Sequence, residues 1–257
     1  MYIRKKVSIL ENNNDSILSV HTDGDTEYYS VTALEELGEI EHYILPKTPD
    51  DKEEDDADFF RLCTLFDFNF NKILTIRNFN CESTEIISCK DTELKTFTEA
   101  NSNVCAITTN VRKSPLVIRS KNIVNVIIYD QGKKVVSLAA INMHQTLDKA
   151  LKTLILELNI KYNSNPLDLK VVMISFGHSK VDVDDSTINI FKSNFHNITH
   201  CISQTDEGLN KVDICKINIA TLLEVGVKYE NIIDIKNKEL PGILANDETV
   251  YTIINIK

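Results

Sequence analysis

The stretch that decides the fold runs from Ile118 to Leu158 and reads IRSKNIVNVIIYDQGKKVVSLAAINMHQTLDKALKTLILEL. Its first half holds two apolar runs, at residues 123–129 and 135–140, on either side of a polar turn at residues 130–133. This pattern predicts two neighbouring strands. The second run passes through residues 141–146 into a segment with apolar residues at helical spacing, namely Leu147, Leu151, Leu154, Ile155 and Leu158. The stretch therefore predicts a strand that feeds directly into a helix.

The junction between this strand and this helix is a common place for a functional site. The free backbone amides at the start of a helix favour negative charge. Here the junction presents Ala140, Asn142 and Met143, with no glycine-rich turn, no acidic residue and no pair of metal-binding side chains. The sequence predicts the framework of a site without its usual chemistry.

Strands and helices are mixed along the rest of the chain. Further strands are predicted at residues 42–45, 73–76, 84–88, 104–109, 116–118, 171–176, 198–203, 232–235 and 250–256, besides an opening hairpin at 7–20 and a strand with a short helical turn at 28–37. Helices are predicted at residues 57–65, after the cap at 184–186, and at 214–224 behind Asp213. Because only some of these elements alternate, we predict an α+β fold, an α/β sandwich with a mixed β-sheet core and helices packed on the outside.

Composition excludes several classes of function. The 257-residue chain has a net charge of −10, whereas phosphate binding needs clustered Lys and Arg, so we expect no nucleic-acid or membrane partner. The six cysteines form no Cys-x-x-Cys pair, and the sequence has no secretory signal or transmembrane run, so we expect a cytoplasmic protein. Abundant Asn, Ile and Lys without Trp suit an A/T-rich genome, such as that of a virus or parasite.

The acidic run at residues 50–58 is the one clear shift in composition. It lacks the alternating ligands and the central glycine of a calcium loop. We interpret it as a solvated loop that precedes a helix N-terminus, where acidic residues suit the helix dipole. The sequence therefore predicts no bound metal here and no cofactor elsewhere.

Four blocks of sequence carry a resemblance to a known family. They are KNIVNVIIYD at 121–130, VSLAAINMHQ at 136–145, ISFGHSKVDV at 174–183, and Asp213-Ile214 followed by LLEVGV at 222–227. Their order and spacing resemble the Ala-Asp-Cys-Leu-Pro, Val-Ala-Ala-x-His-Ala-Gly-Trp-Arg-Gly, Gly-Pro-x-Ile-Gly-Pro and Asp-Leu…Leu-Leu-x-x-Gly-Val blocks of the laccase-domain family. This family is also called the multicopper polyphenol oxidoreductase-like or purine nucleoside phosphorylase family. The resemblance covers about residues 55–235 and implies an α/β sandwich around two sheets.

The sequence departs from this family at the positions that carry its chemistry. The family's active site is a cysteine and two histidines that hold zinc and surround a purine nucleoside. By the resemblance, the cysteine falls on Ile123, the second histidine on Ala140, and the first histidine on Asn80, beside Cys81. The arginine of Gly-Trp-Arg falls on His144. Asn142, in the same block, and His178, in the third block, are further positions of the vestigial pocket. The family's closing Arg-Arg-x-x-x-Thr-Gly-Arg segment is not recognisable in residues 239–257.

Isoleucine and alanine have no lone pair, so they neither bind zinc nor transfer a proton. The leading hypothesis is therefore a catalytically inactive homologue, a pseudoenzyme, that acts through protein–protein binding or self-assembly. One alternative is an enzyme of altered mechanism that phosphorolyses or deaminates purine nucleosides with Cys81, His144 or His178. Another is a sensor that binds purine nucleosides without chemistry. We predict one structural unit, with a divergent strand-rich extension at 1–50 packed on a laccase-like domain at 51–257.

Overall fold

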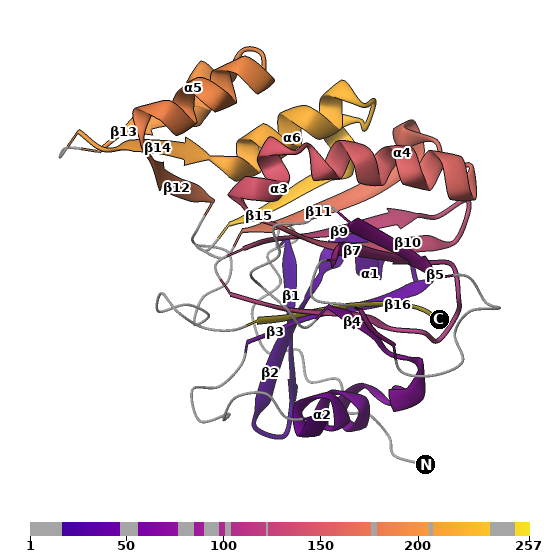
Figure 1. Cartoon of the computed structure of the whole chain (residues 1–257). Helices are drawn as coiled ribbons and strands as arrows, with labels where there is room; N and C mark the ends of the chain where they lie inside the picture. Colours follow the sequence, from indigo (N-terminus) through magenta and orange to yellow (C-terminus); the bar gives the residue numbers. More distant parts are fainter. Residues whose placement is uncertain are drawn as a thin grey trace.

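The computed structural model describes residues 17–46, 56–76, 85–89, 98–100, 104–121, 123–175, 179–205, 208–236 and 250–257. Within these residues, strands and helices pack in layers (Figure 1). From the bottom of Figure 1 upward, the layers are α2 (Asp56–Phe66), a seven-stranded sheet, a six-stranded sheet and a layer of helices. This arrangement confirms the predicted α+β sandwich with mixed sheets inside and helices outside.

The seven-stranded sheet joins segments from distant parts of the chain. Its order is β1 (Leu18–Asp23), β2 (Thr26–Val31), β3 (Ile40–Pro46), β16 (Val250–Ile256), β8 (Leu116–Ser120), β4 (Leu74–Ile76) and β6 (Thr98–Ala100). The short helix α1 (Thr32–Glu35) follows β2. β16 is buried along its whole length because it lies between β3 and β8 and has a layer on each face. The boundary proposed at residue 50 stays a prediction.

The six-stranded sheet has the order β15 (Ile232–Lys236), β11 (Leu169–Ser175), β9 (Val124–Asp130), β10 (Val135–Ile141), β7 (Val104–Thr109) and β5 (Glu85–Cys89). β9 and β10 form the antiparallel pair that the sequence predicts, joined by a turn at residues 131–134. Both faces of this sheet are covered. The central strands therefore read as continuous apolar runs rather than as alternating ones.

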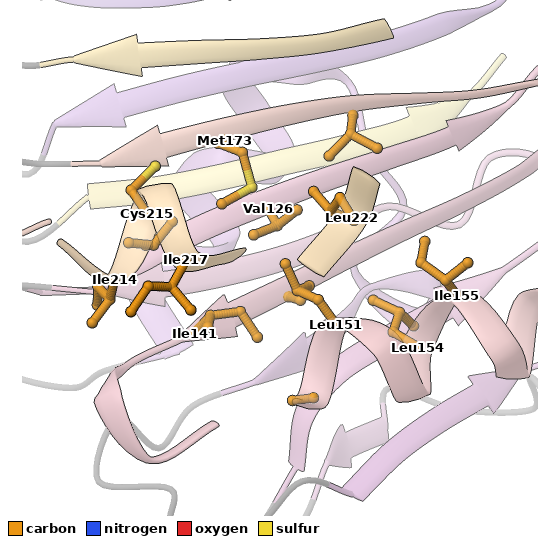
Figure 2. Packing of buried hydrophobic residues seen from close by; sticks show 14 of the residues in the cluster. Val126, Ile141, Leu151, Leu154, Ile155, Met173, Ile214, Cys215, Ile217 and Leu222 are labelled. Carbon is orange, nitrogen blue, oxygen red and sulfur yellow. The ribbon is translucent and has the colours of Figure 1, made fainter. Parts of the chain in front are cut away.

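Three hydrophobic clusters of described residues hold these layers together. Between the sheets, Ile127, Tyr129 and Leu138 of the six-stranded sheet pack with residues of the opposite sheet, including Ile44, Leu116, Ile118 and Ile254. On the outer face of the six-stranded sheet, Val126, Ile141 and Met173 pack against the helices (Figure 2). A third cluster lies below the seven-stranded sheet, where α2 buries Phe59, Leu62 and Phe66 as its spacing predicts.

The helical layer differs from its prediction. The segment after β10 forms two helices, α3 (Met143–Leu147) and α4 (Ala150–Tyr162), because Lys149 adopts a left-handed backbone with φ of 55°. α6 (Ile214–Glu224) packs beside α4 and ends at Gly226, whose φ of 97° matches the predicted stop. Short 3₁₀ turns occur at Phe70–Lys72, Pro166–Asp168, Ile198–Cys201 and Tyr229–Asn231. Among the described residues, no helix is long and apolar enough to cross a membrane.

A small lobe lies between β11 and α6 in the chain. It contains a three-stranded sheet of order β12 (Lys180–Val183), β14 (Asn210–Asp213) and β13 (Ile202–Gln204), covered by α5 (Asp185–Asn194) (Figure 1). Asp184 caps α5 as predicted, since its side chain accepts a hydrogen bond from the Thr187 N–H. The predicted strand at 198–203 is wrong for its first four residues, which form a 3₁₀ turn before β13.

Candidate functional site

Ile123 is buried, and Ala140 is partly buried against a hydrophobic core. Ile123 immediately precedes β9, and its exposed fraction is 8%. On β10, Ala140 lies opposite Asn125 of β9, and its side chain packs against the core between the two large sheets. The two apolar positions therefore occur at the same end of the six-stranded sheet, Ile123 just before β9 and Ala140 on the neighbouring strand β10.

Asn125 is the polar residue beside these two positions, and its side chain is fully buried. Its Nδ2 donates hydrogen bonds to Ser120 Oγ at 2.6 Å and to Thr252 Oγ1 at 2.8 Å. These bonds tie β9 to β8 and β16 across the space between the sheets. Asn125 Oδ1 has no hydrogen-bond partner among the described residues. The sequence signal for this residue was a single amide within an apolar strand, which our sequence interpretation left unused.

Asn142 has a structural task at the start of α3. Its Oδ1 accepts hydrogen bonds from the N–H groups of His144 at 2.7 Å and Gln145 at 3.3 Å. Gln145 Oε1 in turn accepts a bond from the Asn142 N–H at 3.1 Å, which completes a capping box. The amide at this position is thereby held against the helix backbone.

His144 lies at the surface rather than beside Ala140 in the core. Its side chain is 51% exposed, and its Nε2 is 3.7 Å from Asp148 Oδ2 one helical turn away. The structure therefore separates two of the positions that the resemblance groups together. Asn80, Cys81 and His178 lie outside the described residues. Within the described ranges, no three His, Cys, Asp or Glu side chains are close enough to hold a metal ion together.

The described cysteines are unsuited to nucleophilic chemistry. Cys63, Cys89, Cys105, Cys201 and Cys215 are all buried as free thiols. Burial raises the pKa of the Cys63 thiol to about 11. Burial, together with the nearby Asp234 carboxylate, also raises the pKa of Cys215, whose Sγ is 3.4 Å from Asp234 Oδ1. Because the thiolate is the nucleophilic form, raised pKa values keep these groups inert at neutral pH.

A second polar cluster connects β1, β2 and α1. His21 Nε2 is 2.7 Å from Ser30 Oγ and 3.2 Å from Glu35 Oε1, and Ser19 Oγ donates to Glu35 Oε2 at 2.7 Å. The hydrogen bond from His21 lowers the pKa of Glu35 to about 2. Serine and glutamate contact the same ring nitrogen, whereas a catalytic triad needs one on each nitrogen. Ser30 is also only 1% exposed, so this cluster stabilises the fold rather than presenting a nucleophile.

His42 on β3 belongs to the same region of the seven-stranded sheet. The Val31 N–H donates to its Nε2 at 2.7 Å, while its Nδ1 has no partner among the described residues. Burial lowers the pKa of His42 to about 4, so the ring is neutral at physiological pH. This histidine was not a candidate in the sequence, because a single His in a short apolar strand carries no distinctive pattern.

An open groove of about 550 Å³ lies on the small lobe, between α5 and β13. Two side-chain amides on one wall of the groove are hydrogen-bonded, since Gln204 Nε2 donates to Asn210 Oδ1 at 3.0 Å. Asn210 Nδ2 then donates to Asp185 Oδ1 at 2.7 Å. Sequence reasoning missed this groove, because it is formed by three segments that meet only in the folded lobe.

Comparison with solved structures gives the same architecture. YlmD from Geobacillus stearothermophilus has a TM-score of 0.73 at 14% identity, over 94% of this chain and 99% of its own. The hypothetical protein YfiH from Bacillus licheniformis has a TM-score of 0.71 at 12% identity, over 93% of this chain and 99% of its own. NMB0706 from Neisseria meningitidis, a DUF152 protein, has a TM-score of 0.66 at 10% identity, over 85% and 95%. At these identities the likeness shows the fold alone.

The sequence itself also matches a family. No curated protein matches this chain. The family model described as "Multi-copper polyphenol oxidoreductase laccase" matches residues 46–238, well over half of the chain. This protein therefore belongs to the multi-copper polyphenol oxidoreductase laccase family.

Proposed function

We propose that this protein is a catalytically inactive member of its family, a pseudoenzyme, that acts by binding a protein partner or by self-assembly. One observation carries the proposal. Ile123 is 8% exposed and Ala140 packs into the core between the sheets, at positions that the sequence resemblance aligns with the family's cysteine and one of its histidines. Hydrocarbon side chains there bind no zinc and accept no proton.

The hydrogen bonds and the exposure of the neighbouring polar side chains support the same proposal. Asn142 Oδ1 is engaged by two backbone amides of α3, and His144 points into solvent beside Asp148. Asn125 uses its Nδ2 to join the two large sheets. Asn142 and Asn125 hold the fold, His144 faces solvent, and none of these contacts prepares a proton transfer.

Exposed apolar side chains on the helical layer support a binding role. Leu156 and Ile160 lie one turn apart on α4 and are 50% and 78% exposed. Tyr229, in the turn before β15, is 74% exposed. Apolar surface that faces solvent on a folded protein is a frequent feature of contacts with other proteins.

A turnover assay on the full chain tests the inactivity. The protein is incubated with inosine or adenosine, with and without inorganic phosphate, and the products are separated by chromatography. We expect no free base and no conversion of adenosine to inosine above the protein-free blank. Turnover that disappears in Cys81→Ala and persists in Cys63→Ala, a control in the α2 layer, would overturn the proposal and favour an enzyme of altered mechanism.

Two binding measurements complete the test. Elemental analysis of the purified protein should find no stoichiometric zinc, and zinc in the wild type would contradict the proposal. Calorimetry with the same nucleosides should give no heat of binding. Saturable binding without turnover would replace the pseudoenzyme proposal with a nucleoside sensor. The cytoplasmic location and the viral or parasite source stay predictions from the sequence.

A further inference from the structure

The outer edge of β13 carries unpaired backbone groups. β13 is the last strand of the three-stranded sheet. The Thr205 N–H donates to the Leu209 carbonyl, so Thr205 faces β14. Because alternate residues of an antiparallel ladder face the partner strand, Ser203 also faces β14. The backbone groups of Ile202 and Gln204 therefore point away from it.

Three of these outward groups are available for pairing. The Ile202 N–H is used by the Thr199 carbonyl at the end of the preceding 3₁₀ turn. The Ile202 carbonyl and both backbone groups of Gln204 have no hydrogen-bond partner within the described ranges. An acceptor, a donor and a second acceptor in this order match what one added strand requires.

The groove on the small lobe runs along this edge. Ile202, Ser203 and Gln204 all line it, although successive side chains of a strand point to opposite faces. Asn210 of β14, which lies opposite Gln204, lines it as well, so the groove extends over the face of β13 and β14 that carries these two side chains. The opposite wall is α5, which covers the small sheet in Figure 1 and contributes Asp185, Ile188, Asn189 and Lys192.

We propose that the edge of β13 binds an extended segment of a partner protein as an added strand, in the groove beside α5. This inference rests on the proposed protein-binding function and assigns it a site. Strand addition next to a helix combines backbone hydrogen bonds, which give affinity, with side-chain contacts to the helix, which give specificity. The groove volume of about 550 Å³ is within the range of ligand sites in proteins.

The side chains of α5 specify the chemistry of that segment. Ile188 is 6% exposed and forms an apolar floor, and Lys192 lies one helical turn further on. Lys192 forms no ion pair with another described residue, so an incoming carboxylate can pair with it. One helical turn of four residues rises about 6 Å, close to the roughly 6.7 Å between alternate residues of a strand. The expected ligand is therefore an extended peptide with an apolar residue and, two positions away, an acidic residue.

Selection from a combinatorial library of short linear peptides tests this proposal on the full chain. The affinity of the selected peptides is then measured by fluorescence polarisation for the wild type, Gln204→Pro and Gln204→Ala. Both variants lose the side-chain bond to Asn210, but only proline removes the outward N–H. We expect an apolar-x-acidic consensus and about tenfold weaker binding to Gln204→Pro than to Gln204→Ala, because only the proline variant lacks the outward N–H. Lys192→Glu should weaken binding at least as much.

A second measurement covers the case in which Gln204→Pro disturbs the lobe. Peptides methylated on alternate backbone nitrogens should lose binding to the wild type in one of the two alternations and keep it in the other. No selected peptide, equal binding to Gln204→Pro in a folded variant, or indifference to both methylation patterns would overturn the proposal. So would self-association that Gln204→Pro abolishes, because the occupant would then be a second copy. Nucleoside turnover would reject the proposed function without changing any of these peptide results.

Discussion

Polar side chains are buried in the space between the two large sheets, whereas they face solvent in the groove on the small lobe. Between the sheets, Asn125 is fully buried and bonded to two hydroxyls, while its neighbours Ile123 and Ala140 are apolar. On the lobe, Gln204 and Asn189 line an open groove beside an unpaired strand edge. In the first region the polar side chain is buried and hydrogen-bonded within the fold, whereas in the second the polar side chains line a groove that is open to solvent. The comparison shows that the open groove of this chain lies away from the position where the family resemblance points.

Truncating one side chain to alanine in each region should give the largest difference in the free energy of unfolding. Ile127→Ala removes a fully buried side chain between the sheets and should lower the free energy of unfolding by about 2–5 kcal/mol. Ile190→Ala is the matched control on α5, where the side chain is 49% exposed, and should change it by about 0.5 kcal/mol or less. Urea denaturation measures both. Equal losses would show that the lobe is as tightly packed as the main body.

Acid should destabilise the main body through His42. The unfolded chain binds a proton at this residue near pH 6.5, whereas the folded chain accepts it only near pH 4. The unfolded state therefore holds more protons between these values, and stability falls as the pH drops through them, by up to about 3 kcal/mol. Denaturation at several pH values measures the effect. His42→Gln should flatten this part of the profile, and His144→Gln, at an exposed residue, should leave it unchanged.

Asn125→Ala tests whether the buried amide is structural. The change leaves the hydroxyls of Ser120 and Thr252 without this partner and should lower the free energy of unfolding by about 1–3 kcal/mol. Asn189→Ala in the groove is the matched control and should have an effect of about 0.5 kcal/mol or less. Thermal and urea denaturation measure the stability of the two variants. A larger loss of unfolding free energy in Asn189→Ala than in Asn125→Ala would contradict a structural role for the buried amide.

The smallest effect concerns Asn142, at the junction between β10 and α3. Asn142→Ala removes the acceptor of the helix cap and should cost about 1 kcal/mol of unfolding free energy. Asn142→Asp keeps an acceptor and should retain most of the stability. If both variants destabilise the protein equally, the cap is not what this residue contributes.

Local patterns in the sequence predicted much of the fold. The caps Asp184 and Asp213 precede α5 and α6, and the apolar spacing of Phe59, Leu62 and Phe66 matches the buried face of α2. Each of these features depends on residues a few positions apart. The break at Lys149 was missed because apolar spacing continues from Leu147 into α4, and a left-handed residue leaves no trace in that spacing.

The site was less predictable because its contacts are distant in sequence. Asn125 bonds to Thr252, 127 residues away, and this contact exists only because one sheet stacks on the other. The groove on the lobe requires α5, β13 and β14 to be in place together. The family resemblance correctly gave the fold. It could not indicate that Asn142 would cap a helix or that His144 would face solvent.

The position of β16 has a consequence for how the protein is made. Ile253 lies opposite Tyr43 on one side and opposite Val117 on the other, so this strand closes a gap between two segments synthesised much earlier. Until β16 has been synthesised, the edges of β3 and β8 that it joins are unpaired, and pairings this far apart form slowly. Chaperones should therefore bind the nascent chain before β16 takes its place in the sheet. Aggregation during synthesis should depend more on β16 than on any other described strand.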